Sequence, residues 1–267
     1  MSEPDFFDVH SHVTFKDYDQ DLPEVLSRMR EERVHTITVG VDLATSREAI
    51  RFAEEHEGFY ATIGLHPTDT KTESFDAKEF DALAEHPKVV GVGEFGLDFF
   101  RAEADLATEK KRQWIDFEKQ LEFALAHDLP LMLHCRPSKG TYDAYEAVLD
   151  RLEAEFKRVG EKLRGNSHFF VGNVDIARRF YDIGFTTSFT GVVTFAREYD
   201  DVIRFAPRDL IMTETDSPFA SPVPFRGKRN EPTYVKYVVE AIAKIRGAEV
   251  EDIRRATVMT ANRVFGL

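Results

Sequence analysis

The sequence predicts an α/β protein, a single-domain (β/α)8 TIM barrel that covers residues 1–267. Eight short segments are β-branched or aromatic, and several are apolar nearly throughout, as buried parallel strands are. Helix-like segments alternate with them, and a length of 267 residues suits a barrel of this kind. An open, doubly wound sheet is the alternative architecture for the same alternation.

The expected strands are recognised by short runs of Val, Ile, Thr and Phe that end in polar or Gly-containing segments. In chain order they are FFDVHSH (6–12), HTITVGV (35–41), FYATIGLHP (59–67), VVGVGEFGLD (89–98), PLMLHCRP (130–137), NSHFFV (166–171), FTTSFTG (185–191) and LIMTETD (210–216).

The expected helices are recognised by apolar residues at a spacing of three and four. They cover 21–33, 46–57, 77–87, 108–128, 141–163 and 175–184, a short pattern over 196–207, and two final helices over 231–247 and 251–265. No Pro/Gly/Ser-rich linker, repeat or low-complexity tract interrupts this alternation, which favours one domain.

The composition indicates the cellular compartment and the kinds of binding partner to expect. The chain is 42% hydrophobic and 31% charged, with a net charge of −13, which argues against coating a long duplex through a broad basic surface. Cys135 is the only cysteine, so no internal disulfide can form and a reducing, cytoplasmic compartment is expected. The first residues are acidic and no apolar run reaches the ~18 residues of a membrane span, so neither a signal peptide nor a membrane partner is expected. No obligate protein partner is evident.

Polar side chains gather where the expected strands end, which is where barrels of this class hold their chemistry. Five of the nine histidines fall there, together with several acids: His10 and His12 with Asp8, His66, Glu94 with Asp98, His134 with Arg136, His168, and Glu214 with Asp216. A lone buried histidine is usually a packed core residue, and two histidines around one serine are weak evidence. Burying this much polarity on one face is costly unless something pairs it, and divalent metal ions would pair it.

The ligand count predicts two ions. His10, His12 and Asp216 suit one ion, His134 and His168 suit a second, and the two oxygens of Glu94 can bridge both. Imidazole and carboxylate without thiolate suit Mg, Mn or Zn. Glu214 is expected to orient a neighbouring histidine. Cys135 should face away from the barrel interior and be inert.

The chain resembles the TatD family of metal-dependent deoxyribonucleases, which belongs to the amidohydrolase-like barrels. The resemblance rests on FFDVHSH, TIGLHP, VVGVGEFGLD, LHCR, TETDSPF, RGKRNEP and TANRVF in that order, and it spans nearly the whole chain. It implies that the metal ligands are His10, His12, Glu94, His134, His168 and Asp216. It also implies that His66 and Arg136 contact substrate phosphate, with Arg226, Lys228 and Arg229 near the mouth.

Two segments depart from the family pattern. After the sixth strand the family often carries His-Cys-Phe-Ser-Gly, whereas this chain has HFFVG at 168–172. The segment 141–165 is long and charged, and its apolar spacing predicts one amphipathic helix. Both differences bear on substrate preference more than on reaction type.

The expected activity is hydrolysis of phosphodiester bonds in DNA, at single-stranded or nicked ends. A metal-activated water would attack the phosphorus, with Asp216 orienting that water and accepting its proton and Glu94 bridging the ions. An alternative is amide or ester hydrolysis, such as aminoacyl-ester deacylation, by the same constellation. A non-catalytic metal-stabilised scaffold is disfavoured because the second ion would have an open coordination position.

Overall fold

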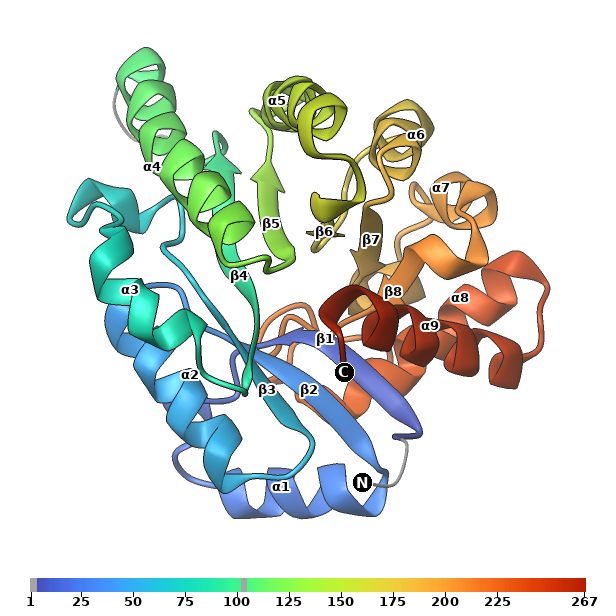
Figure 1. Cartoon of the computed structure of the whole chain (residues 1–267). Coiled ribbons are helices and arrows are strands. Elements are labelled where there is room, and N and C mark those ends of the chain that lie inside the picture. Colours follow the sequence, from blue (N-terminus) through green and yellow to red (C-terminus); the bar gives the residue numbers. More distant parts are fainter. Residues whose placement is uncertain (1–3, 102–104) are drawn as a thin grey trace.

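The protein is a barrel of eight parallel strands in sequential order, β1-β2-β3-β4-β5-β6-β7-β8. The computed structural model describes residues 4–101 and 105–267. The strands are β1 (Phe6–Ser11), β2 (Val34–Val39), β3 (Phe59–Ile63), β4 (Val89–Asp98), β5 (Leu131–Arg136), β6 (Gly165–Ser167), β7 (Thr186–Phe189) and β8 (Ile211–Thr213). Figure 1 shows helices α2 to α7 on the outside of the strand ring. The (β/α)8 prediction is confirmed.

The segment after β8 returns to β1 and brings the two ends of the sheet together. The amide of His12 donates to the carbonyl of Ser217 at 2.8 Å, and the amide of Asp216 donates to the carbonyl of His10 at 2.9 Å. Sequential strand order with this return excludes the open doubly wound alternative, in which the strand order reverses near the middle of the sheet.

The helices occupy the predicted connections, with shifts at their ends. They are α1 (Leu22–Glu31), α2 (Leu43–Glu55), α3 (Ala77–Ala84), α4 (Leu106–Ala126), α5 (Asp143–Val159), α6 (Val174–Asp182), α7 (Asp200–Phe205), α8 (Val235–Arg246) and α9 (Val250–Phe265). Short 3-10 turns are η1 (Lys16–Tyr18), η2 (Asp69–Lys71), η3 (Gly160–Lys162), η4 (Gly191–Thr194), η5 (Arg208–Leu210) and η6 (Pro232–Tyr234).

The largest shifts have local causes. The helix α2 begins before the predicted residue 46 because Asp42 and Thr45 form a capping box at its start. The helix predicted over 141–163 ends at Val159, because Gly160 has a φ of +60°, and the chain continues only as η3. Strand β6 is shorter than predicted because the chain turns at Phe169, whose φ is +43°.

Two apolar clusters hold the barrel. The larger cluster lies between strands and helices, and the smaller includes Phe7, Val9, Ile37 and Met132 together with the α9 residues Val258, Ala261, Val264 and Phe265. Helix α9 contacts β1, β6 and β8, so it covers one end of the barrel with apolar side chains. The polar residues of the site are therefore left at the opposite, carboxyl end.

Close approach of β4 to β5 depends on glycine. Gly93 and Gly96 have φ values of +147° and +149°, and a Cβ at either position would collide with the backbone of β5, at Met132 and His134 respectively. The two glycines flank Glu94 and allow the sheet to bring this acid beside His134.

Among the described residues, no helix is both long enough and apolar enough to cross a membrane.

Candidate metal centre

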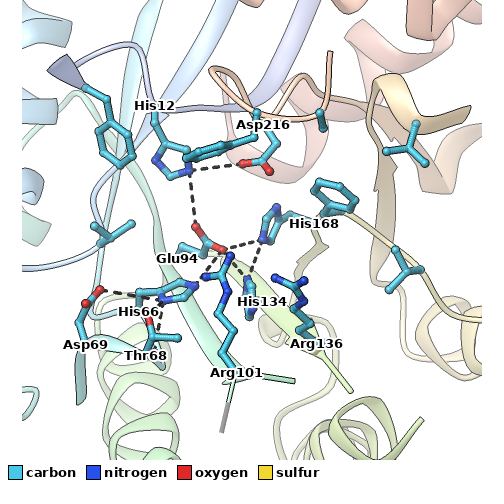
Figure 2. A pocket seen from close by; sticks show the side chains of 18 residues that line it. His12, His66, Thr68, Asp69, Glu94, Arg101, His134, Arg136, His168 and Asp216 are labelled. Atoms are coloured by element: carbon cyan, nitrogen blue, oxygen red, sulfur yellow. Dashed lines mark hydrogen bonds and ion pairs between the residues drawn. The ribbon is translucent and has the colours of Figure 1, made fainter. Parts of the chain in front are cut away.

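A cavity of about 630 Å³ opens at the carboxyl ends of the strands. Its lining includes the predicted site residues His12, His66, Glu94, His134, Arg136, His168 and Asp216. Figure 2 shows these side chains pointing into a common space, with Glu94 between His12 on one side and His66, His134 and His168 on the other.

The first group of ligand atoms comes from β1 and from the segment after β8. His10 Nε2 and His12 Nε2 lie 3.3 Å apart. Glu94 Oε2 lies 3.3 Å from His10 Nε2 and 3.7 Å from His12 Nε2. Asp216 Oδ1 lies 3.8 Å and 3.5 Å from the same two nitrogens. The register of β1 shifts between Asp8 and Ser11, in the stretch that carries His10.

The second group surrounds the other oxygen of Glu94. Its Oε1 lies 2.6 Å from His134 Nδ1 and 2.7 Å from His168 Nε2, and these two nitrogens are 3.3 Å apart. His66 Nε2 is 3.5 Å from the same oxygen. The rings of His10 and His168 stack with centroids 3.8 Å apart, which joins the two groups.

The donor set fits a divalent ion. Ligand atoms around a tetrahedral ion are about 3.4 Å apart when each bond is about 2.1 Å long, and the atoms of the first group are separated by 3.3–3.8 Å. His10, His12 and Asp216 each bring one ligand-type atom within 4.8 Å of the others, and His66, Glu94 and His134 do the same. His10, His168 and Glu214 form a further convergent set.

The electrostatics keep Glu94 ionised, as a metal-bridging carboxylate must be. Burial alone would raise its pKa, but the imidazoles of His168, His66 and His10 hold the pKa of Glu94 well below its ordinary value. The pKa of His168 is raised well above its ordinary value, because the carboxylates of Glu94 and Glu214 outweigh the effect of burial.

Two buried acids lie behind the imidazoles of His134 and His168. Asp98 Oδ2 lies 3.2 Å from His134 Nε2, the ring atom that faces away from Glu94. Glu214 is fully buried, and its Oε1 accepts the Phe169 amide at 2.6 Å and lies 3.6 Å from His168 Nδ1. Ser188 Oγ donates to the other oxygen of Glu214 at 2.6 Å.

The Asp8 carboxylate does not line the cavity and instead accepts hydrogen bonds from neighbouring residues. Its Oδ1 accepts the amides of His10 and Thr215, and its Oδ2 accepts the Thr215 hydroxyl. This carboxyl therefore ties β1 to the segment after β8, which carries Asp216.

His66 is prepared to donate a hydrogen bond. The Thr68 amide donates to His66 Nδ1 at 3.3 Å, so Nδ1 is the acceptor and the proton of the neutral ring is on Nε2. Burial lowers the pKa of His66, which favours this neutral form. Its Nε2–H faces the cavity beside Glu94.

The predicted basic residues occupy different places. Arg136 lines the cavity and its guanidinium lies 4.3 Å from the ring centroid of Phe100. Arg226 stacks on Phe195 at 3.8 Å, and Arg229 forms a two-pronged ion pair with Asp21, with oxygen contacts of 2.5 and 2.7 Å. Neither Arg226 nor Arg229 lines the cavity.

Sequence reasoning missed Arg101, which lines the cavity beside Arg136 (Figure 2). Its amide donates to Asp98 Oδ1 at 2.9 Å, which places it directly after the end of β4. The available signal was a basic residue three positions after a strand-end aspartate. Thr68 and Asp69 also line the cavity and were not predicted.

Comparison with known proteins gives a consistent assignment. The family model described as TatD related DNase matches residues 7–266. The uncharacterized metal-dependent hydrolase YabD of Bacillus subtilis is 39% identical over 264 residues, covering 97% of this chain and 98% of that protein. The 3'-5' ssDNA/RNA exonuclease TatD of Klebsiella pneumoniae is 31% identical, covering 98% of each. The crystal structure of YJJV, a TatD homologue from Escherichia coli K12, superposes with a TM-score of 0.86 at 26% identity, covering 98% of each chain.

Proposed function

Because the chain belongs to the TatD family of metal-dependent hydrolases, we propose that it cleaves phosphodiester bonds in DNA and removes nucleotides from unpaired strand ends. The observation that carries the proposal is the position of Glu94, which presents one oxygen to each of two ligand groups beside two arginines. Two ions, Mg, Mn or Zn, held by His10, His12, Glu94, His134, His168 and Asp216 would lower the pKa of a bound water and polarise the phosphate.

The chain's own residues supply the remaining steps. Asp216 orients the attacking water and accepts its proton, since its carboxylate projects into the cavity beside His12. His66 donates from Nε2 to a phosphoryl oxygen, and the guanidiniums of Arg136 and Arg101 balance the negative charge that builds there. Arg226 is proposed to guide the strand at the mouth. Arg229, already paired with Asp21, would contribute mainly through its charge.

The substrate proposal is supported by the Klebsiella relative, whose name specifies single-stranded DNA and RNA and the 3'-5' direction. The net charge of −13 agrees with a strand end held locally. The cytoplasm is the proposed compartment, because Cys135 is the only cysteine and no internal disulfide can form.

The test is digestion of end-labelled single-stranded DNA by chelator-treated protein with Mg, Mn, Zn or no metal added back. We expect stepwise shortening that requires metal, and loss of this activity in Glu94→Ala but not in Glu122→Ala, a change at an exposed glutamate on α4. Failure to cut with any metal, together with turnover of an aminoacyl-ester or amide panel, would replace the nuclease proposal by the amide or ester hydrolase. Full activity of metal-loaded Glu94→Ala would refute the two-metal scheme.

A further inference from the structure

The cavity has two chemically different walls. The segments after β3, β4 and β5 contribute polar and cationic residues, among them His66, Arg101 and Arg136. The segments after β6, β7 and β8 contribute, besides His168 and Asp216, the apolar residues Phe169, Val171, Val192, Phe219 and Ala220. Figure 2 shows Arg101 and Arg136 on the His134 side of Glu94, away from His12 and Asp216. A ligand that satisfies both walls carries an anion on one side and an apolar surface on the other.

The two phenyl rings of the apolar wall flank the metal ligands. The ring of Phe219 lies edge-on to His12 with centroids 6.3 Å apart, and the ring of Phe169 lies edge-on to His168 at 6.4 Å. Each ring therefore neighbours a ligand of a different group. Phe219 is 53% exposed and lines the cavity, so its ring is accessible to a ligand there.

Residues with positive φ lie at Phe169 and beside Phe219. Described non-glycine residues with positive φ include Phe169 at +43°, Asp216 at +51° and Ala220 at +54°, and all three line this cavity. Such conformations persist only where surrounding contacts fix them, and they gather at functional sites.

Buried polar side chains supply those contacts. Glu214 accepts the Phe169 amide at 2.6 Å. Asn230, fully buried in the RGKRNEP segment, donates to the Phe219 carbonyl at 2.6 Å, while the Phe219 amide donates to the Asp216 carbonyl at 2.9 Å. The backbone that carries both rings is thus held in place before any ligand arrives, which lowers the entropy cost of binding.

We propose that Phe169 and Phe219 form a subsite for the nucleobase of the terminal nucleotide, whose phosphodiester lies over the metal ligands. This inference rests on the proposed nuclease function and adds its specificity determinant. An aromatic ring stacks on any base, so the subsite requires an unpaired base without selecting its identity. The segment HFFVG contributes directly, since both Phe169 and Val171 line the cavity.

The test compares single-stranded oligonucleotides that are identical except for the terminal nucleotide, which carries either a base or an abasic tetrahydrofuran. The readout is the ratio of kcat/KM for the two substrates, measured with the metal-loaded protein and with the analogue at each end in turn. Stacking of one base corresponds to a factor of about 5–160 in affinity. We expect the wild type to prefer the base-bearing strand by a factor in that range, at one end only.

Phe219→Ala should reduce this ratio to near one, Phe219→Trp should preserve it, and Phe169→Cys should reduce it. Phe205→Ala, at a 37% exposed phenylalanine on α7 outside the cavity, should leave it unchanged. As a second measurement, a terminal 2-aminopurine should be quenched on binding to Asp216→Asn protein and less so when Phe219→Ala is added.

The outcomes separate the two proposals. If the wild type cuts neither strand, the nuclease proposal fails. If it cuts both equally well, or if Phe219→Ala slows both by the same factor and leaves the quenching intact, the nuclease stands and the base subsite is refuted.

Discussion

Glu94 is the residue on which the site is built, because each of its oxygens belongs to a different ligand group. Oε2 lies 3.3 Å from His10 Nε2, and Oε1 lies 2.6 Å from His134 Nδ1. A Glu94 side chain that serves both groups must be ionised. The surrounding imidazoles stabilise the carboxylate and hold the pKa of Glu94 well below its ordinary value.

Asp98 is expected to act through His134. Its carboxylate lies 3.2 Å from Nε2 and fixes the ring with Nδ1 toward Glu94. Asp98→Asn keeps the shape but weakens this hold, so metal affinity should fall by about 10–100-fold with little change in Tm. Titration calorimetry of chelator-treated protein measures the effect.

The matched control for that change is Asp81→Asn. Asp81 Oδ1 lies 3.1 Å from His127 Nε2, a pair of the same chemistry outside the cavity, at a more exposed site. We expect Asp81→Asn to bind metal with the affinity of the wild type. Unchanged affinity in Asp98→Asn would show that His134 is not oriented through this carboxyl.

At the scale of elements, the pairing of β4 with β5 sets the distance between Glu94 and His134. Gly96→Ala would place a Cβ against the His134 carbonyl. The substitution should destabilise the fold by about 3 kcal/mol or more, from left-handed backbone strain and steric overlap together, and should reduce activity in the folded fraction.

The variant Gly140→Ala measures how much of the stability loss comes from backbone strain alone. Gly140 also has a positive φ, +77°, but no atom lies within 4 Å of its added Cβ. We expect a loss of about 1–2 kcal/mol there, with full activity. Denaturant melts of both variants measure the difference, and equal losses would show that close strand approach is not the constraint.

The start of α5 predicts a pH dependence of stability. Asp143 Oδ1 accepts the amides of Ser138 and Ala144, and Lys110 Nζ lies 2.7 Å from Oδ2. Burial opposes the charged form, but Lys110 and Ser138 outweigh it and lower the pKa of Asp143 to about 2 from its ordinary 3.8. A folded-state pKa below the unfolded one means stability that is present above about pH 4 and is lost as pH falls toward 2.

Asp143→Asn should therefore cost about 1 kcal/mol at about pH 7, a value reduced for solvent screening of this partly exposed group. The cost should shrink between about pH 4 and 2. Urea unfolding at several pH values measures it. Asp150→Asn, which removes an exposed partner of Arg179, is the control and should change little at any pH. A cost for Asp143→Asn that stays constant with pH would contradict the assigned pKa.

At the scale of the whole molecule, the proposed ligands come from distant parts of the chain, from His10 on β1 to Asp216 after β8. Only the folded barrel brings them together, so ions bind the folded state alone and stabilise it. At an ion concentration about 100 times Kd the gain is about 2.7 kcal/mol, which corresponds to a fall in Tm of about 5–10 °C on chelation.

Differential scanning calorimetry with and without chelator measures this shift. His86→Ala, at a partly buried histidine that pairs with Glu54 outside the cavity, should show the same shift as the wild type, whereas His12→Ala should show a smaller one. Identical melting with and without chelator would mean that the site does not bind ions at the concentrations used.

Much of the fold and of the candidate site could be predicted from the sequence, because strands depend on local residue patterns and the barrel places all strand ends on one face. Runs such as HTITVG predict strands by their β-branched residues, and strand order places His66, Glu94 and His134 at one end. The pairing of Arg229 with Asp21 was not predictable, since the partners are 208 residues apart and depend on where two loops meet. The positive φ of Phe169 was equally hidden, because it depends on Glu214, 45 residues away.

The measurement that tests the central claim most directly is the number of ions bound per chain. Calorimetric titration of chelator-treated protein with Mn²⁺ should give two ions for the wild type, and fewer than two for Glu94→Ala, in which the shared ligand is lost. One ion per chain in the wild type, or two in Glu94→Ala with unchanged affinity, would contradict a centre bridged by Glu94.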